Sequence, residues 1–142
     1  MFHLEYSFVE EGEIVVKAKL LVVDDQMGVR RLLFEAFNEG DYEVVLAESG
    51  YEALEKVKTD MPDIILMDMK MPGMNGLEAL HEIKKINDSI LVIMMTAYGE
   101  LEIVAEAMKL GVKEYVTKPF DINELRELVK KVLDENRKSQ TG

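Results

Sequence analysis

The chain has 142 residues and a formal net charge of −11 at pH 7, and 48% of its residues are hydrophobic, which suits one globular domain. The acidic excess argues against binding to a nucleic-acid backbone, and the lack of cysteine excludes disulfides, thiolate nucleophiles and Cys-ligated metals. Because the sequence has neither an apolar run of roughly 20 residues nor the pattern of a signal peptide, we expect a cytoplasmic protein that does not enter a membrane.

The first 17 residues do not share the pattern of the rest of the chain. Between Phe2 and Phe8, apolar and polar residues alternate with the period of a strand, and an acidic stretch separates them from the apolar residues 14–16. This pattern fits either a small extra hairpin or edge strand, which could pair with a second copy, or a disordered leader. We therefore treat residues 1–17 as an N-terminal extension, and expect a monomer or a weak dimer.

From Lys19 onward, two kinds of apolar pattern alternate. Short continuous apolar runs, typical of strands buried on both faces of a sheet, lie at residues 20–23, 42–47, 63–68, 90–96 and 113–118. Apolar residues at helical spacing follow each run and predict amphipathic helices, at residues 28–39, 50–58, 77–85, 100–110 and 122–133. This alternation predicts a doubly wound parallel α/β domain over residues 18–138. The polar segment NRKSQTG is expected to fray, with residues 139–142 as a tail and no second domain.

The residues that end the predicted strands carry the candidate chemistry. Asp24 and Asp25 follow the first strand, while Asp68, Thr96 and Lys118 end the third, fourth and fifth. In an open parallel sheet, ligands bind at the carboxyl ends of the strands, beside the point where the strand order reverses. Each residue alone is a weak signal in a chain with 28 acidic residues. The complete set, each member after its own buried run, indicates one joint site.

The types of side chain in this set indicate phosphoryl chemistry with a divalent cation. Carboxylates packed together repel one another, and a cation removes that cost. Carboxylate and carbonyl oxygens suit Mg²⁺, and a carboxylate that faces a phosphate donor can act as a nucleophile and form an aspartyl phosphate. A lysine ammonium, a hydroxyl and backbone N–H groups would then neutralise the oxygens of the transferred group.

Four methionines lie around Asp68. Met67 is interpreted as a core residue, and Met69, Met71 and Met74 as adaptable loop surface, because thioethers fill irregular gaps. We do not interpret them as copper ligands.

With these residues in place, the chain resembles the receiver domain of bacterial two-component response regulators. The resemblance covers about residues 19–138 and depends on the segments LLVVDDQ, LMDMKMPGMNG, IMMTAYG and YVTKPF. Within that family it resembles most the single-domain sporulation phosphorelay regulators, through VDDQ, DMKMPGMNG, MTAYGE and KPFDI. The resemblance implies a flavodoxin-like receiver fold, a (βα)5 unit whose strand order is 2-1-3-4-5.

The resemblance also implies a role for each acidic residue. Asp68 would be the phosphoacceptor and would also contact Mg²⁺. Asp25 would bind Mg²⁺ directly, whereas Asp24 would help mostly through water. The backbone carbonyl of Lys70 would complete the protein ligands.

The remaining roles implied by the resemblance concern the phosphorylated state. Lys118 would pair with the phosphoryl group, and its bond to Pro119 is expected to be cis. Thr96 would move its hydroxyl to a phosphoryl oxygen, joined by the N–H of Ala97. Tyr115 would then turn inward into the space that Thr96 leaves, which makes a two-state switch.

Three further residues are predicted to tune the site or its contacts. Lys70 and Tyr98 each lie two residues beyond a site residue and are expected to obstruct the in-line water that hydrolyses the aspartyl phosphate. A slow hydrolysis suits a relay carrier better than a fast signal. Gln26, beside the acidic pair, is a candidate contact for a partner protein.

The resulting hypothesis is a single-domain response regulator. It would accept a phosphoryl group from a histidine kinase or a histidine phosphotransferase and relay it, or display it to a downstream protein. Such a chain is a signalling protein that assists its own phosphorylation and dephosphorylation, and is not expected to be an enzyme.

Several alternatives remain beside this hypothesis. A chemotaxis-type receiver that acts by direct protein binding is the main one. A Mg²⁺-dependent aspartyl-phosphate phosphatase is disfavoured because Lys70 stands where such enzymes need an acid or base. A degenerate receiver would lack an acid or the lysine, and a flavodoxin-like flavin binder would need a Ser/Thr-rich loop after the first strand.

Overall fold

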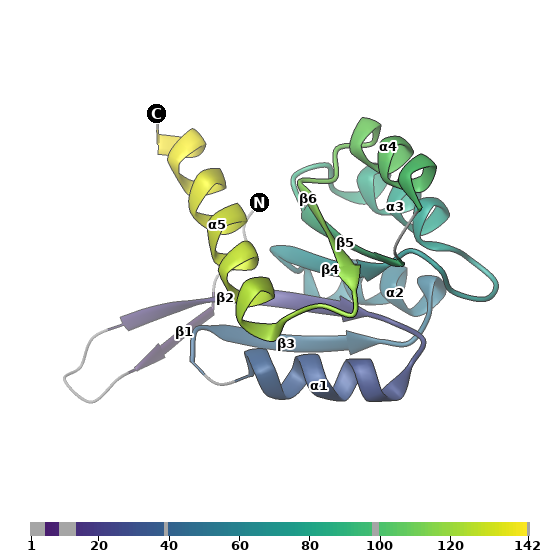
Figure 1. Cartoon of the computed structure of the whole chain (residues 1–142). Coiled ribbons are helices and arrows are strands. Elements are labelled where there is room, and N and C mark those ends of the chain that lie inside the picture. Colours follow the sequence, from purple (N-terminus) through teal and green to yellow (C-terminus); the bar gives the residue numbers. More distant parts are fainter. Residues whose placement is uncertain (1–4, 9–13, 39, 98–99, 142) are drawn as a thin grey trace.

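The chain folds into a mixed sheet with helices on both faces (Figure 1), seen in a computed structural model that describes residues 5–8, 14–38, 40–97 and 100–141. The strands are β1 (Glu5–Phe8), β2 (Ile14–Val23), β3 (Tyr42–Ala47), β4 (Ile64–Asp68), β5 (Leu91–Ala97) and β6 (Glu114–Lys118). The helices are α1 (Met27–Phe37), α2 (Gly50–Asp60), α3 (Gly76–Ile86), α4 (Leu101–Lys109) and α5 (Ile122–Thr141). Among the described residues, no helix has the length and apolar character that a membrane span requires.

The five strands from β2 to β6 form the parallel part of the sheet. Their spatial order is β3-β2-β4-β5-β6, which confirms the predicted order 2-1-3-4-5 for the five βα units. The strand order reverses between β2 and β4, since the chain goes first to one side of β2 and then to the other. This crevice is the place where an open parallel sheet binds ligands.

Two hydrophobic cores hold the helices against the sheet. On one face, side chains of α2, α3 and α4 pack against alternate strand residues such as Leu21, Ile65 and Met94. On the other face, α1 and α5 cover the intervening residues, such as Leu20 and Leu66. Because each strand is buried on both faces, it reads as a continuous apolar run in the sequence.

The loop after β4 differs from the prediction for its methionines. Met69 and Met71 are 3% and 7% exposed, so their assignment to the loop surface was wrong. The chain folds back on itself here, because the N–H of Gly76 donates to the carbonyl of Met69 at 3.1 Å. A Cβ on Gly76 would lie 2.6 Å from the Met69 Cα, so only glycine permits this approach.

β2 begins earlier than the sequence pattern predicts. Its first residues, from Ile14 to Lys17, pair antiparallel with β1, and its last residues, from Ala18 to Val23, pair with β3 and β4. Figure 1 shows the β1–β2 pair extending beyond α1. The extension and the receiver body therefore share one strand.

The helix boundaries follow local signals in the sequence. Ser49 Oγ accepts the N–H of Glu52 at the start of α2, and Asn75 with Glu78 forms a capping box at the start of α3. α5 continues to Thr141, through residues that we expected to fray. Side-chain ion pairs along this helix, such as Arg137 with Asp134 at 3.9 Å, support the added turns.

Candidate functional site

The three aspartates of the predicted site lie together at the carboxyl end of the sheet. Val23 of β2 pairs with Met67 of β4, so the residues that follow them, Asp24 and Asp68, emerge side by side. One carboxylate oxygen from each of Asp24, Asp25 and Asp68 lies within 4.8 Å of the others. Asp24 and Asp68 are buried, whereas Asp25 is exposed. The cluster therefore has two buried carboxylates and one that is exposed to solvent.

Lys118, at the end of β6, bridges the two buried carboxylates. Its Nζ atom lies 2.6 Å from Asp24 Oδ2 and 3.5 Å from Asp68 Oδ1. The bond from Lys118 to Pro119 is cis, as the resemblance implies. A buried carboxylate is costly unless it is paired, and this single ammonium provides the pairing for both.

Asp24 is held by groups on both sides of its carboxylate. The backbone N–H of Gln26 donates to Asp24 Oδ1 at 2.9 Å, while Lys118 holds Oδ2. Arg30 Nη1 donates to the backbone carbonyl of Asp24 at 2.9 Å. No protein hydrogen bond to the Asp25 carboxylate is found within the described part of the chain. Asp25 is thus the acid with the most oxygen atoms available to an added cation.

The environment of Asp68 disfavours its negative charge. Burial, together with the nearby charge of Asp24, raises the pKa of this carboxyl from 3.8 to about 6, although Lys118 and the N–H of Lys70 oppose the rise. Lys118 therefore compensates only part of the combined charge. A divalent cation would remove the rest, so the carboxylates present fit a Mg²⁺ ion, whose preferred ligands are oxygen atoms.

Thr96 lies one residue before the end of β5, next to Met95, which pairs in register with Asp68, and it is 3% exposed. Its hydroxyl donates to Glu100 Oε2 at 3.2 Å, and not to any carboxylate of the aspartate cluster. Glu100 Oε1 in turn lies 2.8 Å from the ammonium of Lys70. This pairing raises the pKa of the exposed Lys70 side chain. One glutamate thus connects two of the predicted site residues.

Sequence reasoning did not select Glu100. An acid at the start of a helix is common, since it favours the positive end of the helix dipole, so its position alone carried no signal. The segment MTAYGE, which carried part of the resemblance, contains the residue without giving it a role.

The other predicted residues that the structure describes are all exposed. Ala97, next to Thr96, is exposed. Tyr115 is 42% exposed on β6 and pairs in register with Met94 of β5. Gln26 is exposed just before α1. Tyr98 lies outside the residues that the structure describes.

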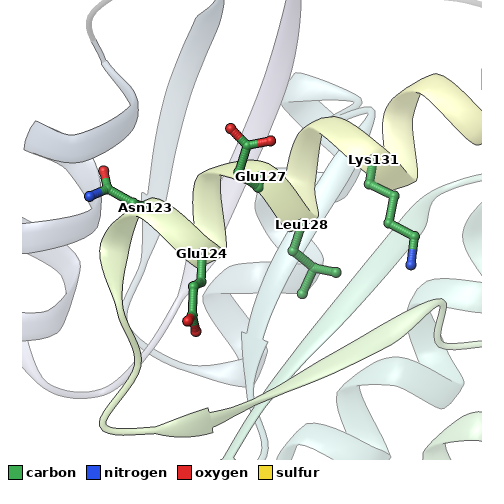
Figure 2. A pocket seen from close by; sticks show the side chains of 5 residues that line it. All are labelled: Asn123, Glu124, Glu127, Leu128 and Lys131. Carbon is green, nitrogen blue, oxygen red and sulfur yellow. The ribbon is translucent and has the colours of Figure 1, made fainter.

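A hollow on the surface of α5 is lined by residues other than those of the predicted site. Figure 2 shows its side chains, all of them from α5: Asn123, Glu124, Glu127, Leu128 and Lys131. None of these is a member of the acidic cluster. We therefore do not connect this hollow with phosphoryl chemistry.

Comparisons with known proteins match this architecture. A family model described as the response regulator receiver domain matches residues 20–130. Sporulation initiation phosphotransferase F of Bacillus subtilis is 48% identical over 84% of this chain and 96% of that protein. Chemotaxis protein CheY of Listeria monocytogenes is 41% identical over 80% of this chain and 96% of that protein.

Solved structures agree with the sequence comparisons. A CheY-like response regulator receiver domain protein from Methanospirillum hungatei aligns with a TM-score of 0.83 and 30% identity, over 87% of this chain and 98% of that chain. The resemblance drawn from the four motifs is thereby confirmed.

Proposed function

The chain belongs to the response regulator receiver domain family, and we propose that it carries a phosphoryl group on Asp68 as an intermediate in phosphoryl relay. The observation that carries this proposal is the cluster of Asp24, Asp25 and Asp68 with Lys118 between its two buried members. Three carboxylates and one ammonium at a strand-order reversal suit a doubly charged cation and a phosphoryl group together.

The Mg²⁺ ion would be held by oxygen atoms of the cluster. Asp25 and Asp68 would bind it with the backbone carbonyl of Lys70, and Asp24 would act mostly through water, since Gln26 and Lys118 already hold its carboxylate. When bound, the ion supplies positive charge that offsets the negative charge of the phosphoryl oxygens.

Asp68 would act as the nucleophile toward a phosphohistidine. A carboxylate oxygen of Asp68 forms the new O–P bond while the N–P bond of the donor histidine breaks and its electron pair stays on the imidazole. Asp68 must be ionised to do this, and with a pKa of about 6 it is mainly ionised at pH 7.5. Lys118, 3.5 Å from Asp68, would neutralise charge on the phosphoryl oxygens.

Phosphorylation would then change the surface through Thr96 and Tyr115. The Thr96 hydroxyl and the Ala97 N–H would turn to the phosphoryl oxygens, and Tyr115 would move inward. The half-exposed position of Tyr115 in this structure is consistent with the outward state of such a switch. A downstream protein that binds the active conformation more tightly would shift the equilibrium between the two conformations.

Relay is favoured over a chemotaxis-type signal by the residue types at positions 70 and 98 of the sequence and by the relatives. The identity to a protein named a sporulation initiation phosphotransferase is 48%, against 41% to a chemotaxis protein CheY. Lys70 and Tyr98 would slow hydrolysis by obstructing water, which preserves the phosphoryl group for the next carrier.

The partners follow from this role. We propose a histidine kinase or a histidine phosphotransferase as the donor and a downstream protein as the receiver, with Gln26 on the contact surface. The chain would work in the cytoplasm as a signalling protein that assists its own phosphorylation, and residues 1–17 would be an extension added to the receiver domain of residues 18–138.

The experiment is intact-mass spectrometry after addition of a small acyl phosphate, with and without Mg²⁺. We expect a gain of about 80 Da that requires Mg²⁺ and is absent in Asp68→Asn. Asp88→Asn, which changes an exposed aspartate before β5, is the matched control and should gain the same mass. Folded wild-type protein that gains no mass with Mg²⁺ from either an acyl phosphate or a phosphorylated histidine phosphotransferase would contradict the proposal.

A further inference from the structure

Glu100 makes two contacts that tie the neighbourhood of the acceptor together. Its Oε2 accepts the hydroxyl of Thr96 at 3.2 Å and its Oε1 pairs with the ammonium of Lys70 at 2.8 Å. The Glu100 side chain is 13% exposed, although it stands at the surface entry to a helix. A single carboxylate therefore joins the end of β5 to the loop after β4.

The backbone position of Glu100 would also let its side chain act on the helix. Glu100 is the residue immediately before α4, where a negative charge interacts favourably with the free N–H groups of the helix. Here the side chain makes no cap hydrogen bond to α4. Its carboxylate is directed instead to Thr96 and Lys70, so the start of α4 is connected to the site.

The contact with Thr96 competes with the role proposed for that residue. A threonine hydroxyl has one proton to donate, and in this structure Glu100 Oε2 is the nearer acceptor at 3.2 Å, with the Ala97 carbonyl at 3.5 Å. The same proton cannot also be donated to a phosphoryl oxygen on Asp68. A hydrogen bond to a carboxylate is stronger than one to a neutral acceptor. Breaking the Thr96–Glu100 bond therefore costs free energy when Thr96 turns to the phosphoryl group.

We propose that Glu100 is a positioning residue that holds Thr96 and Lys70 in their unphosphorylated arrangement and is released from both when Asp68 is phosphorylated. This inference rests on the proposed function, because it takes Asp68 as the acceptor. It adds to that function a residue that couples the acceptor to α4.

The charges around the site give the release its direction. A phosphoryl group adds about −1.5 to −2 charge, which repels the Glu100 carboxylate and attracts the ammonium of Lys70. The same group offers oxygens that accept the Thr96 hydroxyl. Both contacts of Glu100 thus weaken together, and the loss of both changes the entry to α4.

The test compares Glu100→Ala, which removes both contacts, with Glu100→Gln, which keeps an acceptor for Thr96 and loses the ion pair. Glu102→Gln is the matched control, because Glu102 is an exposed acid in the first turn of the same helix. Amide NMR spectra without phosphate donor are compared with the spectrum of phosphorylated wild-type protein. The initial rate of acyl-phosphate labelling is measured on the same samples.

We expect the Thr96, Ala97 and α4 amides of Glu100→Ala to move toward their phosphorylated positions. The labelling rate should rise about tenfold, as expected for loss of one hydrogen bond to a charged group. Glu100→Gln should show a smaller shift of the same kind, and Glu102→Gln none. In the pair Glu100→Ala and Lys70→Ala, the rate effects should not add, since the two residues share one contact.

Each result separates this inference from the proposed function. If wild-type protein is labelled on Asp68 but the spectra and rates of both Glu100 variants match wild type, the positioning role is refuted while the acceptor role stands. If wild-type protein is never labelled, both fall. If Glu100→Ala does not fold, Glu100→Gln alone decides, and an unchanged spectrum and rate would refute the role.

Discussion

Replacement of Asp68 by Asn should stabilise the protein at neutral pH in the absence of Mg²⁺. Asp68 is 6% exposed, its carboxylate lies beside buried Asp24, and its pKa is raised from 3.8 to about 6. Asn has nearly the same shape and carries no charge. Lys118 keeps a partner in the variant, because it also pairs with Asp24 at 2.6 Å.

The size of the effect follows from the pKa. A rise of about two units corresponds to about 3 kcal/mol of free energy that the folded state loses when Asp68 is ionised. Partial screening by solvent and the coupling to Lys118 reduce this figure, so we expect Asp68→Asn to raise the free energy of unfolding by about 1–3 kcal/mol at pH 7.5.

The effect should disappear at low pH, and this gives it a signature. Below about pH 4, Asp68 is protonated in both the folded and the unfolded state, so its charge costs nothing. Between about pH 4 and 6 the folded state retains a proton that the unfolded state releases, so wild-type stability falls relative to the variant as the pH rises. Above about pH 6 the difference stays constant.

The difference in the free energy of unfolding is measured by urea unfolding of both proteins in the presence of a metal chelator, at several pH values from 4 to 7.5. Added Mg²⁺ should reduce it, because a cation that binds only the folded wild type stabilises that state. Equal unfolding free energies of the two proteins at pH 7.5, or a difference that does not change with pH, would refute the electrostatic account of the cluster.

Three further changes test other parts of the site. Asp25→Ala should weaken Mg²⁺ binding at least tenfold, as measured by calorimetry. It should cost little stability, because Asp25 is exposed. An unchanged Mg²⁺ affinity would show that Asp25 is not a ligand of the ion. Lys118→Met should lower the free energy of unfolding by about 2–4 kcal/mol in urea titrations, since it leaves Asp24 and Asp68 without their shared cation. Labelling of this variant by acyl phosphate should also be lost. Full stability of the variant would contradict the bridging role of Lys118. Lys70→Asn should shorten the half-life of the aspartyl phosphate several-fold in a mass-spectrometric time course, and a half-life equal to that of wild type would show that Lys70 does not obstruct water.

Local pattern was sufficient for the parallel sheet and for the residues at its edge. Strands buried on both faces appear as continuous apolar runs and helices as a three-to-four residue period, and both are properties of neighbouring residues. Once the strands were placed, the position of Asp68 at a strand end followed from counting. The predicted place of Lys118 followed in the same way.

Contacts between distant segments could not be derived in this manner. The pairing of Lys118 with Asp24 joins residues 94 positions apart, and its preference for Asp24 over Asp68 depends on how β6 is set beside its neighbours. The pairing of β1 with β2 is a choice of partner for a short alternating segment, which periodicity alone leaves open.

The sequence by itself determined which chemical groups reach the carboxyl edge of the sheet, because strand ends are local. Only the tertiary structure decided which of these groups are buried and which groups they contact. Asp24 and Asp25 are adjacent in the chain, yet one is buried against Lys118 and the other faces solvent, since the two side chains leave the backbone in different directions. Glu100 looks like an ordinary helix-start acid until the fold places Thr96 and Lys70 within reach of its carboxylate.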